Sequence, residues 1–294
     1  MYSEQEQKKK IKSLLNKFKI SFADPIDLKK VNGFLVYSKE TIDNTSNSEL
    51  KHKYENECKE IKNKKEKNIY RYYYYEKFEN DSPSPLHATI VMMNPAFADS
   101  VESDNTIKNI ENYLNNEKDA ILKHLPNIHN NFGSFDIINL YPIRMPKSEK
   151  LNEFLELTKI ETEKYQKFVK EYLSKIDKNH IVIAAWGDDK KDNELARKLF
   201  ADLDIKFYCY GLTKNGYPKH FSSLAYNNFN KFRCPLPYIK INNWIKESGL
   251  SDYDKERLTD VKNLKQWLTD SKSISQYYVD YMNGLLKDVF EQVE

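Results

Sequence analysis

The sequence contains few of the residues that build several common kinds of site. Only 3 of its 294 residues are cysteines (Cys58, Cys209 and Cys234), and no C-x-x-C or H-E-x-x-H motif is present. The sequence therefore indicates neither a disulfide framework nor a zinc site. It has only 7 glycines, and it lacks both G-x-G-x-x-G and the Walker phosphate loop, so kinases and nicotinamide dehydrogenases are not expected. We expect no metal and no redox cofactor.

Long hydrophobic runs are also missing. The longest span only a few residues, such as 181–186 (IVIAAW), whereas a helix that crosses a bilayer needs about 20 apolar residues. Residues 1–19 are charged and amphipathic, without the apolar core and cleavage site of a secretory signal. We therefore expect a cytoplasmic protein with no membrane partner.

Acidic residues are absent from one long stretch, 205–245, although the net charge of the whole chain is only +3. The stretch carries six Lys and Arg side chains interleaved with Phe and Tyr. Cations bind phosphates and aromatic rings stack on bases, so this stretch favours DNA as a partner. We assign Lys214, Lys219, Lys231 and Arg233 as DNA contacts. The alternative is a basic surface over an aromatic core.

The remaining composition is that of a folded protein. Hydrophobic residues make up 39% of the chain and charged residues 31%, but 13% of all residues are aromatic. So many aromatic side chains argue against general disorder. The length suffices for one large α/β domain or two small domains.

Strand and helix patterns alternate through the middle of the chain. Apolar strands separated by helices favour a parallel sheet that is covered on both faces. The expected strands are 88–93, 135–140, 181–186 and 205–210, and the expected helices between them are 106–125, 151–176 and 193–203. We predict an α/β fold, a three-layer α/β/α domain with a mostly parallel central sheet of about four strands.

Three regions are expected along the chain. Residues 1–68 form an N-terminal helical or connector region, with an amphipathic helix at 3–18 and a short strand at 33–38. Residues 69–235 form the α/β core domain. Residues 236–294, where the pattern becomes helical, form a C-terminal extension.

Polar residues follow several of the expected strands. Ligands of parallel α/β sheets bind beyond the carboxyl ends of the strands. Asn94 and Pro95 follow the first expected strand, Asn139 and Arg144 lie at and after the end of the second, and His220 lies after the fourth. We therefore expect these residues to gather at one crevice.

Five separated motifs within residues 70–225 resemble, in the same order, the domain-of-unknown-function family number 1643. They are MMNPAFAD (92–99), DNT (104–106), INLYPIR (138–144), AWG (185–187) and GLTKNGYPKH (211–220). Their order is also similar to that of the uracil-DNA glycosylase superfamily, which has an N-P or D-P motif, an Asn after the next strand, an apolar strand ending in Gly and then H-P-S-P-L. The second resemblance implies a glycosylase-like fold that releases a base from DNA.

The glycosylase resemblance implies roles for individual residues. Asn94 lies in the first motif, and Asn139 matches the Asn that reads the base. His220, Ser222 and Leu224 match H-P-S-P-L at its His, Ser and Leu. The resemblance therefore implies that His220 acts on the base and that Leu224 belongs to the loop that inserts into DNA.

The sequence departs from the glycosylase pattern around the pocket. Met92 replaces the Gly of the first motif, and Phe221 and Ser223 replace the two prolines of H-P-S-P-L. Asn94 stands where the fastest branch has an Asp that activates water. These departures imply a slower or differently specialised enzyme, so a modified or bulky base, such as one in phage DNA, is as reasonable a substrate as uracil.

The chemistry of base release requires the same residue types. Cleaving an N-glycosidic bond puts negative charge on the departing base, which a hydrogen-bond donor such as His220 stabilises. Asn94 would hold the attacking water without ionising. The base must leave the stack, and we expect Phe97 to sandwich it while Leu224 fills the gap.

Each of these residues has a structural alternative. Asn94-Pro95 is an ordinary turn starter, and Asn139 would satisfy loop backbone groups. Asp99 and Asp104 are secondary acid/base candidates, but helix capping is the more common use of such residues. Arg144 either binds substrate phosphate or covers a helix end.

The sequence therefore predicts a DNA glycosylase-like hydrolase that releases an extruded base. One alternative is a hydrolase that acts on free nucleotides or nucleosides. Another is a nucleic-acid-binding module without catalysis. Neither the target base nor the oligomeric state follows from the sequence.

Overall fold

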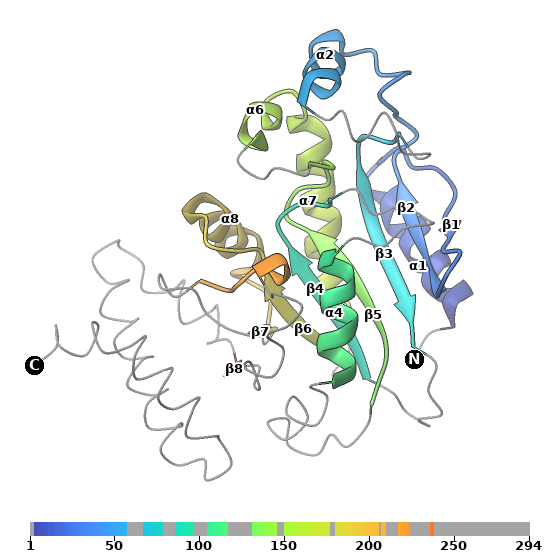
Figure 1. Cartoon of the computed structure of the whole chain (residues 1–294), viewed down its shortest axis with the longest axis vertical. Helices are drawn as coiled ribbons and strands as arrows, with labels where there is room; N and C mark the ends of the chain where they lie inside the picture. The colour runs from blue at the N-terminus through green and yellow to red at the C-terminus, as the bar shows by residue number, and fades with distance from the viewer. Residues whose placement is uncertain are drawn as a thin grey trace, which may run out of the picture.

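The computed structural model describes residues 3–57, 67–78, 86–96, 105–116, 131–145, 150–176, 180–205, 207–209, 217–223 and 236–237. Their strands form one eight-stranded sheet in the order β1-β2-β3-β5-β4-β6-β7-β8 (Figure 1). The strands are β1 (Ile26–Asp27), β2 (Asn32–Tyr37), β3 (Arg71–Lys77), β4 (Leu86–Met92), β5 (Phe132–Asn139), β6 (His180–Ala185), β7 (Phe207–Cys209) and β8 (Leu236–Pro237).

Four neighbouring strands at the centre of the sheet are parallel. β4 pairs in parallel with β5 and β6, and β6 pairs in parallel with β7. These are the four apolar strands that the sequence predicts, and the α/β class is confirmed. The expected size of the sheet is wrong, because antiparallel β1, β2, β3 and β8 extend it on both sides and make it mixed.

The N-terminal region supplies part of this sheet. β2 pairs with β3 in a register that runs from Asn32↔Lys77 to Tyr37↔Arg71. The two strands approach closely at Gly33, where an added Cβ would lie 2.2 Å from the carbonyl oxygen of Tyr75. Residues 1–68 are therefore more than a helical or connector region, and the expected boundary at residue 68 falls between two paired strands.

Helices pack on both faces of the sheet. They are α1 (Glu4–Lys17), α2 (Ser48–Glu57), α4 (Asn105–Asn116), α6 (Asn152–Leu155), α7 (Lys159–Ser174) and α8 (Lys190–Phe200), with a short 3₁₀ helix η2 (Phe221–Ser223). One hydrophobic core involves α1, α7 and α8, and a second involves α4 and η2. Alternate residues of β4 belong to different cores, Val91 to the first and Ile90 to the second, so the cores lie on opposite faces. Figure 1 shows α4 in front of the sheet and α1 and α7 behind it.

The amphipathic N-terminal helix that the sequence predicts is confirmed as α1. Its first turn is closed by a capping box, in which the Ser3 hydroxyl accepts from the Glu6 backbone N–H and the Glu6 carboxylate accepts from the Ser3 N–H. Ile11, Leu14 and Leu15 are buried in the first core. The helix is thus held by its apolar stripe.

The long helix expected at 151–176 is interrupted. α6 ends at Leu155 and α7 begins at Lys159. Between them, the Thr158 hydroxyl donates to the carbonyl oxygen of Phe154 at 2.9 Å. A threonine side chain that bonds to a preceding carbonyl often bends a helix, and the break lies at this residue.

The C-terminal extension lies almost wholly outside the described residues. Within 236–294, only the two residues of β8 are described, and they pair with β7. The structure thus leaves the predicted C-terminal helices untested. In the part of the chain that the structure describes, no helix is both long and apolar enough to cross a membrane.

Candidate functional site

A cavity of about 460 Å³ lies at the carboxyl ends of β4 and β6. Asn94 lines it after β4, the turn at Gly187 lines it after β6, and His220 lines it from the segment that follows β7. Small-molecule sites have volumes of roughly 300–1,000 Å³. The structure therefore brings Asn94 and His220 together at a strand-end cavity of suitable size, as the sequence predicts.

The turn after β6 fixes one wall of this cavity. Gly187 has a φ of +97°, a left-handed backbone conformation that is strained for residues with a side chain. Its N–H donates to the carbonyl oxygen of Pro218 at 3.1 Å, which ties the segment of His220 to the end of β6. Asn193 of α8 donates to the carbonyl oxygen of Gly187 at 3.1 Å and accepts from the Trp186 indole at 2.7 Å. The wall is thus braced from two elements.

Hydrogen bonds from Ser222 determine where His220 carries its proton. The backbone N–H of Ser222 donates to Nδ1 of His220 at 3.2 Å, and the Ser222 Oγ lies 2.7 Å from the same nitrogen. A ring nitrogen that accepts a hydrogen bond cannot carry a proton, so the proton of the neutral ring resides on Nε2. His220 is therefore an N–H donor at the cavity.

Hydrogen bonds from its amide nitrogen orient the side chain of Asn94. Its Nδ2 donates to the carbonyl oxygen of Met145 at 2.8 Å and to that of Pro95 at 3.2 Å. Both donors are directed at protein carbonyls, so Oδ1 is the atom through which this side chain can bind water or substrate. Pro95 is buried and does not line the cavity. Its carbonyl oxygen instead shapes the turn by accepting from the Met145 N–H at 3.0 Å.

Asp192 also lines the cavity, although the sequence does not single it out. It lies in the first turn of α8 and is 5% exposed. Burial raises the pKa of its carboxyl to about 6, while a hydrogen bond from Tyr141 acts in the opposite direction. A carboxyl group with such a pKa exchanges its proton near neutral pH, as acid/base residues do. The available signal was its place in the helix after the third expected strand, five residues beyond Gly187.

Two predicted site residues lie elsewhere. Arg144 is fully buried, and its Nη1 donates to the carbonyl oxygen of Asn68 at 3.2 Å. Its guanidinium carbon lies 5.0 Å from the ring centre of Tyr37. It does not line the cavity, and its burial leaves the expected phosphate contact unsupported.

Asn139 is 1% exposed and does not line the cavity either. Its backbone N–H donates to the Tyr165 hydroxyl at 2.9 Å. Its Oδ1 is buried and has no hydrogen-bond partner among the described residues. The structure therefore does not support the expected contact between Asn139 and a base in this cavity.

The other candidates are only partly described. Ser222 is exposed and lines the cavity, while Lys219, next to His220 in the sequence, is half-buried. The remaining predicted residues lie outside the described part of the chain: Phe97, Asp99, Asp104, Lys214, Leu224, Lys231 and Arg233. The basic stretch therefore stays a prediction.

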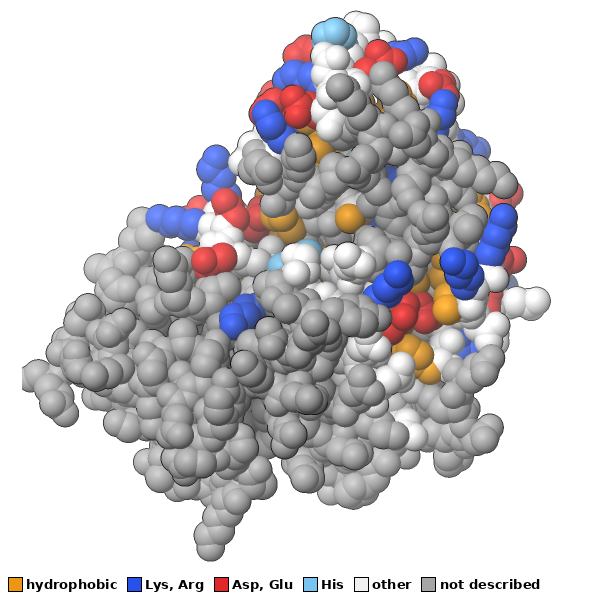
Figure 2. All heavy atoms as spheres, in the orientation of Figure 1, with side chains coloured by type: hydrophobic (Ala, Val, Ile, Leu, Met, Phe, Trp, Pro, Cys, Tyr) orange, Lys and Arg blue, Asp and Glu red, His pale blue; other side chains and the backbone are white. Residues whose placement is uncertain are grey.

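Charges of both signs are interspersed on the described surface. Figure 2 shows acidic and basic side chains side by side over α2 and α8. The described residues that line the cavity include Asp188, Asp189 and Asp192, and neither Lys nor Arg. The cavity thus favours an uncharged or cationic group over a phosphate.

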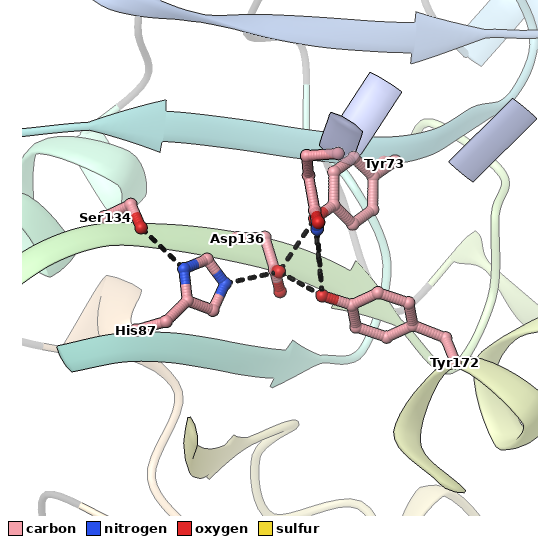
Figure 3. Close-up of polar contacts among 6 residues, drawn as sticks. Tyr73, His87, Ser134, Asp136 and Tyr172 are labelled. Carbon is pink, nitrogen blue, oxygen red and sulfur yellow. Dashed lines mark hydrogen bonds and ion pairs between the residues drawn. The ribbon is translucent and has the colours of Figure 1, made fainter. Parts of the chain in front are cut away.

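A separate polar cluster lies inside the sheet (Figure 3). Oδ2 of Asp136 accepts from His87 Nε2 at 2.6 Å, from the Tyr73 hydroxyl at 2.7 Å and from the Tyr172 hydroxyl. His87 Nδ1 lies 2.7 Å from the Ser134 Oγ. Ser, His and Asp are the residue types of a hydrolytic triad, but Ser134 and Asp136 are 0% exposed and none of the cluster lines the cavity. We assign it to the stability of the fold.

The described residues show no metal cluster. They contain no group of three or more His, Cys, Asp or Glu side chains that could hold a metal ion.

One protein family matches the chain. The family described as "Protein of unknown function (DUF1643)" matches residues 71–220, about half of the chain. The chain belongs to this family. The match to DUF1643 runs from β3 to His220 and includes Asn94, Gly187 and Asp192, so the family region contains every lining residue of the cavity except Ser222. The similarity to uracil-DNA glycosylases stays a prediction. No curated protein and no solved structure matches the chain at a significant level.

Proposed function

We propose that this DUF1643 protein is a hydrolase that releases a base from DNA by cleaving its N-glycosidic bond. The observation that carries the proposal is the meeting of Asn94 and His220 in one cavity at the carboxyl ends of parallel strands. The four parallel strands with helices on both faces also support a glycosylase-like three-layer fold.

The two side chains offer complementary groups. The Nε2–H of His220 is a donor for the base, whose oxygen and nitrogen atoms gain negative charge as the bond breaks. The Oδ1 of Asn94 is an acceptor that can hold a water by one of its protons. Donor and acceptor thus match the two partners of the reaction, the leaving base and the attacking water.

The proposal of DNA as the partner rests on the sequence. Residues 205–245 carry no acidic side chain, and His220 lies within that stretch. A strand of DNA would follow these cations while one base enters the cavity.

A second candidate is a hydrolase that acts on free nucleosides. The acidic residues that line the cavity favour it over a nucleotide hydrolase, because three aspartates repel a phosphate. A nucleoside contains the same bond and carries no phosphate. The two candidates differ in the substrate and share the chemistry.

The proposed function can be tested by identifying released bases. The full chain is incubated with natural, uracil-containing and phage-modified DNAs and with free nucleosides, and the bases are detected by mass spectrometry. We expect base release from at least one DNA. His220→Ala and Asn94→Ala should each slow it by about 10²–10³-fold, because each group acts mainly in the transition state.

Rates are expressed per folded molecule, since Asn94→Ala also removes two hydrogen bonds. His52→Ala is the matched control, because His52 is an exposed histidine of α2, outside the cavity. Base release from nucleosides alone would favour the second candidate. No base from any substrate, or full activity of both cavity variants, would contradict the proposal.

A further inference from the structure

Among the described residues that line the cavity, Asp192 is the one buried carboxyl group that can take a proton from water, because Asp188 and Asp189 are exposed. His220 accepts at Nδ1 from Ser222 and so has no ring nitrogen left to act as a base. An amide such as Asn94 does not ionise. Asp192 is the remaining buried polar side chain among the described residues that line the cavity, with 5% of its surface exposed.

The position of Asp192 is fixed by two elements. Asp189 caps α8 by accepting from the N–H groups of residues 191 and 192, which sets the first turn of the helix. The hydroxyl of Tyr141, in the segment after β5, donates a hydrogen bond to the Asp192 carboxylate. The phenol remains protonated, because burial and Asp192 raise the pKa of Tyr141.

The charged groups around Asp192 act in both directions. Burial disfavours its ionised form most, and the charge of Asp189 adds to that effect. The Tyr141 hydrogen bond and the Lys191 charge favour the ionised form. His220 and Asp188 line the same cavity. The balance leaves a carboxyl group that is mostly ionised at pH 7 and above, and is still basic enough to accept a proton.

We propose that Asp192 is the general base of this site, and that it takes a proton from the water held by Asn94. This inference rests on the proposed N-glycosidic hydrolysis. One O–H bond of water breaks and its proton moves to the carboxylate. The water oxygen forms a bond to C1′ of the sugar, while the C1′–N bond breaks and its electron pair goes to the base. His220 donates a hydrogen bond to that base, which then takes up the proton from Asp192 through solvent.

The proposal explains how a site with Asn at position 94 activates water. A general base typically contributes about 10²–10⁴-fold to a rate. A carboxylate in the helix that follows β6 supplies this function from a different element. Asp192 would then be a catalytic residue, and Tyr141 a positioning residue that acts through it.

The test measures base release by the full chain between pH 4.5 and 9, on the substrate found in the base-release assay. We expect the wild-type rate to rise with pH, to be half-maximal near pH 6 and to level off above about pH 7, as Asp192 ionises. Asp192→Asn should lose about 10²–10⁴-fold at pH 8 and lose this rise, and Asp192→Glu should restore part of both. Asp202→Asn, an exposed aspartate beyond the end of α8, should behave as wild type.

Tyr141→Phe gives an independent readout. It removes the hydrogen bond that favours the ionised carboxylate, so the rise should move to higher pH while the plateau is nearly kept. If Asp192 has only a structural role, Asp192→Asn should instead lower the melting temperature and leave the pH profile of the rate unchanged. That result would overturn the inference. The inference would also be overturned if Asp192→Asn were active while His220→Ala and Asn94→Ala were inactive. That result would leave the proposed function intact. A wild-type protein that releases no base would overturn both.

Discussion

Two buried aspartates show how the surroundings of a single residue decide its role. Asp136 is surrounded by donors from His87, Tyr73 and Tyr172. Burial alone would raise its pKa, but the charge of His87 and these hydrogen bonds lower it below the ordinary value of 3.8. Asp192 has fewer such partners, and burial raises its pKa. The first carboxylate is kept ionised inside the fold, and the second is poised to exchange a proton.

The stability of the fold should depend strongly on Asp136. Asp136→Asn removes a buried charge while its donors remain, and breaking a buried pair of this kind costs about 3–5 kcal/mol. Urea unfolding at pH 7 measures the loss. The matched control is Asp202→Asn, whose partner Lys170 lies 2.8 Å away on the surface, and it should change the free energy of unfolding by about 1 kcal/mol or less. If the two variants lost the same free energy of unfolding, the structural role of Asp136 would be contradicted.

The rule that ligands bind beyond the carboxyl ends of parallel strands predicts some site residues and not others. Asn94 and His220 follow apolar strands whose ends meet, so their approach to one cavity is predictable from sequence. Asp192 is not, because its burial depends on how α8 packs against Tyr141. Arg144 follows a strand too, but the chain there turns back so that its N–H donates to the carbonyl oxygen of Ile69, and its side chain is buried away from the cavity.

At the scale of elements, the first core depends on how α1 docks. Gln7 of α1 donates to the Tyr73 hydroxyl at 2.5 Å, and Ile11 and Leu15 are 0% exposed. The helix therefore contributes both apolar contacts and a polar contact to the hydroxyl that binds Asp136. Its sequence already shows this stripe, which is why it was predictable.

Truncation of the docking face of α1 should destabilise the whole domain. Leu15→Ala removes buried methyl groups, and such changes cost about 2–5 kcal/mol. Ile160→Ala is the control on α7, because Ile160 is 73% exposed and should change stability by about 0.5 kcal/mol or less. Chemical denaturation of both variants measures these changes in the free energy of unfolding. A Leu15→Ala protein as stable as the control would mean that α1 adds little to the core.

The limits of sequence reasoning about elements have physical causes. Apolar runs of several residues reveal β4, β5 and β6, whereas β1 and β8 are two residues long and carry no detectable period. The helix expected at 193–203 begins earlier, at Lys190, because Asp189 caps it. The break lies at Thr158, whose side chain bonds to the backbone, a contact that apolar spacing does not encode.

For the whole molecule, buried carboxyl groups should make stability depend on pH. Folding raises the pKa of Asp192 from 3.8 to about 6, and burial together with Glu111 raises the pKa of Glu76. Between these values the folded protein keeps protons that the unfolded chain has released, so stability falls as pH rises. Asp136 has the opposite effect, because its stabilising contribution is lost as pH falls below 3.8.

The free energy of unfolding should therefore be larger near pH 4.5 than at pH 7.5. At about 1.4 kcal/mol for each pKa unit, the full effect of Asp192 is about 3 kcal/mol, of which about 2 kcal/mol falls between these two pH values. Asp192→Asn should remove that part, so the variant should gain stability relative to wild type as pH rises from 4 to 6. Urea unfolding across this range tests the sign. A constant difference between variant and wild type would show that Asp192 has the same pKa in both states.

The central claim is that the cavity adds water across an N-glycosidic bond, and the most direct measurement follows the oxygen atom of that water. The reaction is run in H₂¹⁸O with a DNA whose base is released, and the abasic sugar is trapped by reduction before mass spectrometry. We expect one ¹⁸O at C1′ for each base released, and a loss of both products in His220→Ala. Base release without ¹⁸O in the sugar, or DNA that stays intact under all conditions, would contradict hydrolysis at this site.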